Sequence, residues 1–309
     1  MTGSVRDQFR RLHRDGTFVM PNPWDVGSAR VLVSLGFPTL ATTSSGFAAS
    51  LGRRDQQVTR DELVAHVAAL TRAVDVPLNV DAERGYSDSL DGIGVTVDLL
   101  AQAGAAGVSI EDYDPGAGRV EDFRVAVERV AAAATACARH GIVLTAWAEN
   151  YLYGRADLPD TIARLRAYQD AGAEVVYAPG LRQLADVTRL VQQVSVPVNV
   201  LALHDGPSVA ELAGVGVRSV STGGALAMAA YGALRSAARE LLDSGTSGYG
   251  ARALTAQEIA AAFGSALRWE ERGLALRARP TSVCSRCSCS WGASRRPIGW
   301  GAGVGERRP

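Results

Sequence analysis

The chain has 309 residues, in which 32 Lys+Arg balance 32 Asp+Glu to give a formal net charge of +0. Its 47% hydrophobic and 21% charged residues are typical of a globular protein of one large domain or two ordinary ones, and the balanced charge argues against nucleic acid as a partner, because phosphate binding needs a basic surface. Every basic residue is Arg, and the absence of lysine excludes enzymes that form a Schiff base on lysine and Walker-type phosphate loops.

Hydropathy along the chain bears on its location. No apolar run approaches the roughly 20 residues needed to span a bilayer. The segment from Met1 to Gly16 is charged and lacks the apolar core of a signal peptide. We therefore expect no membrane partner and a cytoplasmic protein.

From Thr17 to Gly224 one pattern repeats, in which a helical stretch is followed by a short apolar run that stops on polar residues. The apolar runs do not alternate polar with apolar residues, which is typical of parallel strands buried on both faces. Eight strands are predicted: Phe18–Pro21, Thr39–Thr43, Pro77–Asp81, Gly107–Glu111, Val143–Trp147, Glu174–Ala178, Val198–Leu201 and Ser219–Ser221.

Helical patterns lie between these runs, and several end in a Gly that suits a left-handed cap. The clearest are Arg60–Val74, Asp91–Ala103, Asp122–His140, Asp160–Ala171 and Leu181–Gln193. Alternating strands and helices of this number predict an α/β fold, a (β/α)8 TIM-type barrel. An open doubly wound sheet is the alternative, but its Gly-rich phosphate turn is missing.

Two more helices are predicted beyond the barrel, over Tyr231–Leu242 and Thr255–Glu271, the second with Thr255 and Glu258 as a capping box. Residues 1–276 are therefore expected to form one barrel domain with extra C-terminal helices.

The remaining segment, 277–309, is rich in Arg, Ser, Gly and Cys without periodicity, and it is expected to be disordered. Its cysteines Cys284, Cys287 and Cys289 are followed by no second ligand pair, so a structureless segment is favoured over a metal site.

Functional groups of such barrels lie at the carboxyl ends of the strands. Acidic residues dominate the ends of the third, fourth and fifth strands: Asp81, Glu83, Glu111, Asp112 and Glu149. Acids that converge repel one another unless a cation joins them or some are protonated. A set of oxygen ligands favours Mg2+, or Mn2+, over zinc, with Asp81 as the direct ligand and Glu83 and Glu111 holding metal-bound water. Alternatively, these acids cap helices or pair with arginines such as Arg84.

Other polar groups follow the remaining strands. The run from Thr42 to Gly46 ends the second strand with hydroxyls and a Gly, which can hold a carboxylate or phosphate, or else act as an ordinary helix N-cap. Further strand-end candidates are Trp24, Asp55, Trp147 and Asn199. The histidines are less promising. Three are expected at the surface of helices, His13, His66 and His140, and one follows the seventh strand, His204.

Four segments together resemble the isocitrate lyase/phosphoenolpyruvate mutase superfamily: Asn22–Asp25, Gly46–Gly52 with Asp55, Asn79–Tyr86 and Gly107–Asp112. The resemblance covers about residues 5–270. It implies a (β/α)8 barrel, often a homodimer or homotetramer whose eighth helix is swapped between subunits. It also implies Mg2+ held through Asp81, with Glu83 and Glu111 in water-mediated roles.

Superfamily members cleave or form C–C or P–C bonds next to a 2-oxo acid through an enolate. The resemblance therefore implies a lyase or phosphonomutase-type enzyme acting on a small 2-oxo or 2-hydroxy carboxylate. We expect three catalytic residues, Asp55, Glu111 and Glu149. The substrate is expected to contact Trp24, Thr43, Ser44, Ser45, Gly46, Trp147 and Asn199.

Two departures limit this resemblance. The loop Tyr113–Arg119 lacks the Cys that lyase branches place after the fourth strand, which argues against isocitrate or methylisocitrate cleavage through a Cys. At the fifth strand, Trp147 stands where the superfamily has an Arg that clamps the substrate carboxylate, and an indole cannot replace a bidentate guanidinium. Trp147 either impairs activity or alters specificity. A catalytically silent barrel that binds a small acid or serves as an assembly subunit is the competing hypothesis.

Overall fold

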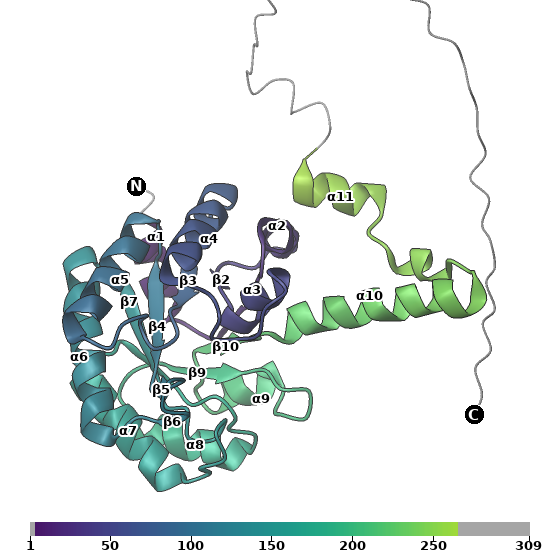
Figure 1. Ribbon diagram of the computed structural model, residues 1–309. Helices are drawn as coiled ribbons and strands as arrows, with labels where there is room; N and C mark the ends of the chain where they lie inside the picture. The colour runs from purple at the N-terminus through teal and green to yellow at the C-terminus, as the bar shows by residue number, and fades with distance from the viewer. Residues whose placement is uncertain (1–3, 265–309) are drawn as a thin grey trace, which may run out of the picture. The chain divides into compact units, whose positions relative to one another are not determined.

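The computed structural model describes residues 4–264. Eight parallel strands form one sheet in the order β1-β10-β9-β8-β7-β4-β3-β2 (Figure 1). The two outer strands are joined where the Ala41 amide donates to the Pro21 carbonyl at 3.1 Å, so the sheet is a nearly closed (β/α)8 barrel, as predicted. The strands are β1 (Phe18–Met20), β2 (Leu40–Ala41), β3 (Leu78–Asp81), β4 (Gly107–Glu111), β7 (Val143–Trp147), β8 (Val175–Tyr177), β9 (Val198–Leu201) and β10 (Ser219–Ser221).

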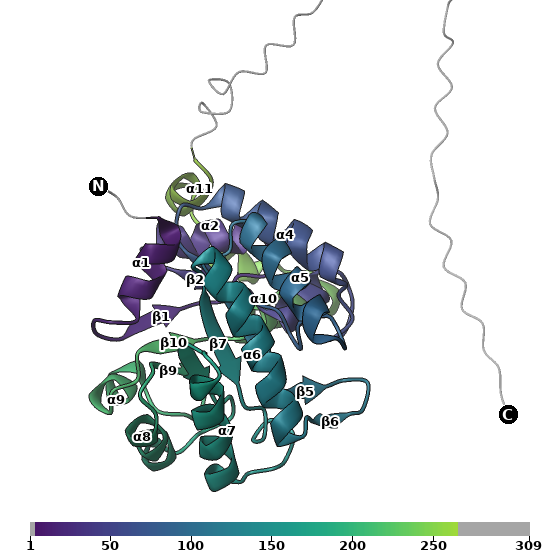
Figure 2. The same ribbon diagram turned by 90° about the vertical axis from the view of Figure 1, so that its left-hand side faces the viewer.

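Helices surround these strands (Figures 1 and 2). Most of them begin at a Ser, Thr or Asp whose side chain accepts a backbone N–H, as Thr59 does from Glu62, which stabilises the first turn. They are α1 (Val5–Leu12), α2 (Val26–Ser34), α3 (Ser44–Ser50), α4 (Arg60–Ala73), α5 (Leu90–Gln102), α6 (Phe123–His140), α7 (Leu158–Asp170), α8 (Leu184–Gln193) and α9 (Val209–Gly214).

Two local features differ from the sequence-based expectation. Helix α8 begins at Leu184 rather than Leu181, because Gly180, with φ 91°, turns the chain after β8. A short antiparallel hairpin, β5 (Tyr113–Asp114) with β6 (Arg119–Val120), follows β4. It was not predicted, because two-residue strands carry no periodic signal.

The core has two parts. Outward-facing strand residues such as Val80, Leu144 and Val220 are buried between the barrel and its helices. A smaller apolar cluster fills the barrel at the amino ends of the strands and includes Phe18 and Phe9 of α1. Each such side chain stabilises the fold by about 1.5–3 kcal/mol. The interior becomes polar toward the carboxyl ends.

Two histidines lie in the core, so their predicted surface position is wrong. His13 packs edge-on against the rings of Phe9 and Phe18, with centroids 4.7 and 4.9 Å away. His66 stacks on Phe47 at 3.8 Å. Helical position alone did not reveal that neighbouring aromatic rings cover both imidazoles.

Burial lowers the pKa of His13 from 6.5 to about 4. The unfolded chain therefore binds a proton that the folded one rejects, so stability is lost as pH falls from about 6.5 to about 4, by up to about 3 kcal/mol. In urea titrations, the free energy of unfolding of the parent should fall relative to that of His13→Gln as the pH is lowered from about 6.5 to about 4. The exposed His204 supplies the control, His204→Gln, which should keep the parent's pH dependence. Parallel curves for His13→Gln and the parent would contradict the prediction.

After β10 the chain continues into α10 (Ala225–Ser244), the 3-10 helix η1 (Gly248–Arg252) and α11 (Ala256–Phe263). Helix α10 runs away from the barrel in Figure 1, and α11 packs against α2. The predicted capping box of Thr255 and Glu258 is present, and α10 is longer than the predicted Tyr231–Leu242. The end of the predicted helix Thr255–Glu271 and the segment 277–309 lie outside the described residues. Within 4–264, no helix is both long and apolar enough to cross a bilayer.

Candidate active site

The predicted acids come together at the carboxyl ends of three adjacent strands. Asp81 ends β3 and Glu111 ends β4, while Glu83 and Glu149 follow β3 and β7 by two residues. All four are 2–7% exposed. Burial raises the pKa of each, and charge repulsion among them adds to the effect. The site therefore holds a cluster of carboxyl groups that favours protons or a cation.

Asp81 is fixed by its backbone surroundings. One carboxylate oxygen accepts the Ser44 amide at 2.9 Å, and the other accepts the Glu83 amide at 3.2 Å. Its own amide donates to the Thr42 hydroxyl at 2.9 Å. Burial raises the pKa of Asp81 to about 6, with a further contribution from the charge of Asp55. The side chain is thus oriented before any ligand arrives.

The glutamates are less completely paired. Glu83 has φ 46°, a left-handed conformation that strains a non-Gly residue, and its Oε1 is buried without a hydrogen-bond partner among the described residues. Burial and the charge of Asp81 raise the pKa of Glu83 to about 8. Glu149 Oε1 is also buried without a partner in that part of the chain. Such orphaned oxygens point to a missing ligand.

Loops bring in residues that the sequence analysis missed. Gln56, with φ 64°, donates from Nε2 to Glu111 at 2.8 Å. The ring of Tyr153 stacks on Tyr113 at 3.5 Å, and burial with the charges of Glu149 and Glu111 raises the pKa of Tyr153. The one signal in the sequence for a site role of Gln56 was its position next to the candidate residue Asp55.

Asp55 itself is exposed, unlike the other acids. Its charge nevertheless raises the pKa of Asp81, Glu83 and Glu149, so it lies near the mouth. Its proposed catalytic role stays a prediction.

The hydroxyl-rich segment after β2 is the N-terminus of α3. Thr43 is the N-cap and accepts the Gly46 amide at 3.2 Å, and its hydroxyl lies 3.2 Å from that of Ser45. Gly46 permits this tight turn, since a Cβ there would lie 2.5 Å from Thr43 Cγ2 and 3.2 Å from Cβ of Trp24. Thr43 thus fills the alternative N-cap role, and the Ser44 amide is bound to Asp81.

Asp112 has a supporting role next to Glu111. Its carboxylate accepts hydrogen bonds from Arg164 at 3.1 Å, from the Tyr168 hydroxyl and from the Glu149 amide at 2.8 Å. Arg164 and Tyr168 lie one turn apart on α7, so this helix locks the ends of β4 and β7 together. Arg84 pairs instead with Glu121 and Asp88 beside the hairpin.

Below the acids, a small cavity of about 40 Å3 lies inside the barrel, between Asp81, Trp147, Tyr177 and Asn199. Trp147 is half-buried and meets the Tyr177 ring edge-on at 4.8 Å and 82°. Strand pairing sets Trp147 beside Glu111. Trp147 and Asn199 both line the barrel interior, and their contact with substrate stays a prediction.

Comparison with known proteins is consistent with this geometry. The family model described as phosphoenolpyruvate phosphomutase matches residues 9–242. The chain belongs to the phosphoenolpyruvate phosphomutase family.

Similar proteins include an uncharacterized protein of Mycobacterium tuberculosis (strain ATCC 25618 / H37Rv), 35% identical over 238 residues, 76% of this chain and 89% of the relative. Oxaloacetate decarboxylase 2 of Pseudomonas fluorescens is 33% identical over 236 residues, 73% of this chain and 79% of the relative. A crystal structure of a lyase/mutase candidate from Burkholderia cenocepacia J2315 has 43% identity and TM-score 0.81, covering 85% of this chain and 96% of that one. At the level of the family, the expected resemblance and a lyase- or mutase-like enzyme are confirmed.

The composition of the acidic cluster bears on whether it can hold a divalent cation. Among residues 4–264, no three Asp, Glu, His or Cys side chains lie close enough together to hold one ion directly. The donor set is all oxygen, and two of its oxygens, on Glu83 and Glu149, lack partners in the described chain. These features fit a hard cation that has one direct protein ligand and retains its water, as Mg2+ commonly does.

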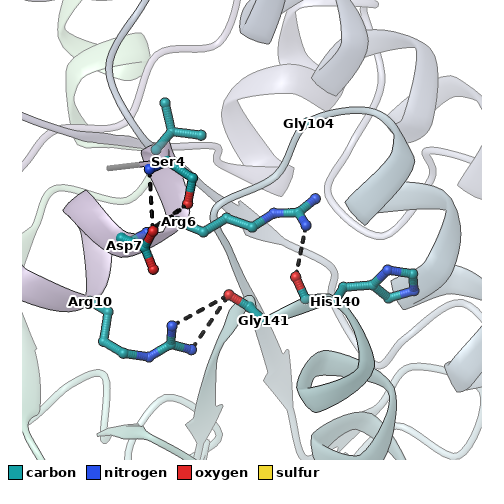
Figure 3. A pocket seen from close by; sticks show the side chains of 8 residues that line it. Ser4, Arg6, Asp7, Arg10, Gly104, His140 and Gly141 are labelled. Atoms are coloured by element: carbon teal, nitrogen blue, oxygen red, sulfur yellow. Dashed lines mark hydrogen bonds between the residues drawn. The ribbon is translucent and has the colours of Figure 1, made fainter. Parts of the chain in front are cut away.

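A larger recess of about 470 Å3 lies at the opposite end of the barrel (Figure 3). It is formed by α1 together with Gly104 and Gly141, which precede β4 and β7. The Arg6 guanidinium there donates to carbonyls such as that of His140 at 2.7 Å, and Arg10 pairs with Glu174. Because these cations hold α1 against the barrel, the recess is structural.

Proposed function

We propose that this protein is a Mg2+-dependent enzyme that breaks or forms a C–C bond next to the 2-oxo group of a small carboxylate, through an enolate. The observation that carries the proposal is the cluster of four buried carboxyl groups on β3, β4 and β7, whose pKa values burial and repulsion raise. The similarity to an oxaloacetate decarboxylase supports it. P–C bond chemistry is the less favoured form, because the similar proteins include an oxaloacetate decarboxylase and a 2-methylisocitrate lyase.

Asp81 would bind the Mg2+ directly, and Glu83 and Glu111 would hold its water molecules; Mn2+ could substitute. The hydrogen bonds from Ser44 and Glu83 fix the Asp81 carboxylate for that role. When bound, the ion stabilises the negative charge that develops on the substrate oxygen as the enolate forms.

The remaining residues bind the substrate and move protons. The hydroxyl groups of Ser44 and Ser45 at the start of α3 would contact the substrate carboxylate. Glu111 and Glu149 would carry protons, because burial keeps a carboxyl group protonated at higher pH than usual. Asp55 would act from its exposed loop beside the reacting group.

The silent-barrel hypothesis is not favoured. The oxaloacetate decarboxylase and the 2-methylisocitrate lyase to which the chain is similar are enzymes. Four buried acids also destabilise a fold, and a protein that needs no chemistry gains nothing from keeping them.

The proposal is tested by turnover. The purified chain with millimolar Mg2+ would be incubated with a panel of 2-oxo and 2-hydroxy acids, and pyruvate or its homologues would be measured by coupled reduction. At least one panel member should be cleaved, and Glu149→Gln should lower kcat. Turnover by Glu149→Gln at the parent rate would remove Glu149 from the mechanism. No turnover on any member would favour the silent barrel.

We also propose that the protein is a homodimer or homotetramer in which α10 contacts a second copy. Large apolar side chains of α10 are exposed, among them Leu234 at 65% and Leu242 at 85%. Exposed apolar surface of this kind marks an interaction site. Light scattering should show an oligomer for the parent and a monomer for Leu234→Glu with Leu242→Glu. Leu35→Glu, at an exposed Leu at the end of α2, is the control. A monomeric parent would contradict the proposal.

A further inference from the structure

The charge of the interior cavity restricts what can occupy it. Among the residues that line it, Asp81 is the one charged side chain, and the rest are neutral. Polar neutral groups come from Thr145, Asn199 and Ser221, and the aromatic surface comes from Trp147 and Tyr177. No arginine belongs to the lining, and the chain contains no lysine.

Several arginines elsewhere in the described chain are held by acids. Arg84 pairs with Glu121, Arg164 with Asp112, and Arg53 with Glu62. Because no arginine lines the cavity, a carboxylate placed there would lose its water without gaining a cationic side chain as a partner. Burying an unpaired anion is strongly unfavourable.

The cavity nevertheless offers unused hydrogen-bonding groups. The Trp147 Nε1–H and the Asn199 Oδ1 are both buried without partners among residues 4–264. Asn199 is 4% exposed, and its Nδ2 already donates to the Ser221 hydroxyl at 2.9 Å. Asn79 Oδ1 and the Ser219 hydroxyl, which also line the cavity, likewise lack partners in the described part of the chain, so the lining offers one N–H donor, two amide oxygens that accept and one hydroxyl. A ligand hydroxyl group can accept from the Trp147 N–H and donate to the Asn199 oxygen.

From these features we infer that the substrate has a single carboxylate and an uncharged far end that bears a hydroxyl group, which lies in the cavity beside Trp147 and Asn199. The inference rests on the proposed function, since it assumes that the substrate carboxylate lies above, near Ser44 and Asp81. On this inference, the substrate of this protein is not a dicarboxylate such as oxaloacetate. It also excludes loss of a second carboxylate as CO2, and leaves cleavage or formation of a C–C bond between the two ends.

Three stable four-carbon 2-hydroxy acids form a matched test, because they differ only at the far end. Malate ends in a carboxylate, 2,4-dihydroxybutanoate in a hydroxyl and 2-hydroxybutanoate in a methyl group. Each would be titrated calorimetrically into the full chain with saturating Mg2+, with oxalate as the reference ligand. We expect 2,4-dihydroxybutanoate to bind at least tenfold more tightly than malate, with 2-hydroxybutanoate between them.

Variants at Trp147 identify the group responsible. Trp147→Phe keeps an aromatic ring but removes the N–H, so the preference for 2,4-dihydroxybutanoate over 2-hydroxybutanoate should fall severalfold. Trp147→Arg supplies a cation and should reverse the order in favour of malate. Tyr249→Phe, outside the barrel, is the control for loss of a polar aromatic group.

The outcomes separate the two proposals. Tightest binding of malate by the parent would overturn the inference and show that a loop arginine such as Arg54 or Arg155 supplies the missing cation. An unchanged preference in Trp147→Phe would also overturn the role of the indole. If oxalate does not bind in the presence of Mg2+, the proposed function itself fails.

Discussion

Replacing Asp81 by Asn should abolish stabilisation of the protein by Mg2+ and Mn2+ and lower turnover by about a thousandfold or more, since a metal ion supplies several kcal/mol of transition-state stabilisation. A ligand that binds only the folded state stabilises it by about 2.7 kcal/mol at a hundred times its Kd. That corresponds to a rise in Tm of roughly 5–10 °C for a domain of this size. Thermal unfolding with and without the ions measures the effect.

The Asn side chain is chosen because it can still accept a hydrogen bond from Ser44 or Glu83 and removes a buried charge. Without metal, Asp81→Asn should therefore be at least as stable as the parent, which separates loss of the ion from loss of the fold. Asp15→Asn, at an exposed acid after α1, is the matched control and should keep the parent's response. A parent whose Tm does not respond to millimolar Mg2+ or Mn2+ would contradict the metal assignment.

The second large effect is expected at Arg164, which is 4% exposed in its side chain and bonds to Asp112 and Asp160. Arg164→Met leaves the Asp112 carboxylate buried without its cationic partner, which typically costs about 3–5 kcal/mol. At about 2–4 °C per kcal/mol, the Tm should fall by roughly 6–20 °C. Because the Glu149 amide donates to Asp112, kcat should fall as well.

Tyr168→Phe tests the same hydrogen bonds to Asp112 with a smaller change. It removes only the hydroxyl bonded to Asp112, so it should cost about 1.5–3 kcal/mol, less than Arg164→Met. Urea unfolding of the three proteins gives the comparison. Arg164→Met within 1 kcal/mol of the parent would show that Asp112 becomes neutral or hydrated at little cost, and that α7 does not lock the two strand ends.

The barrel was predictable because its strands are continuous apolar runs between capped helices. The bounds of β4, β7, β9 and β10 agree with the predicted runs, since burial on both faces leaves a strong compositional signal. The hairpin after β4 was missed because its strands are two residues long. The start of α8 depends on the turn at Gly180 rather than on periodicity.

The acids of the site were predictable for a related reason, because a residue that ends a barrel strand must lie at the mouth. The positions of Asp81 and Glu111 at the mouth follow from the bounds of their strands alone. Gln56 and Tyr153 could not be found in this way, since the paths of their loops depend on contacts made after the barrel has formed. The burial of His13 likewise depends on Phe9 and Phe18, which approach from two other elements.

If this site forms an enolate next to a carboxylate, the protein should catalyse hydrogen exchange of pyruvate, and this assay needs no knowledge of the natural substrate. Pyruvate in D2O with Mg2+ and the protein would be followed by 1H NMR of its methyl signal. We predict that the methyl signal is lost much faster with the parent protein than with Mg2+ and buffer alone. With Asp81→Asn, the signal should be lost at the rate seen with Mg2+ and buffer alone. Exchange at the background rate with the parent protein would show that the site does not form the enolate.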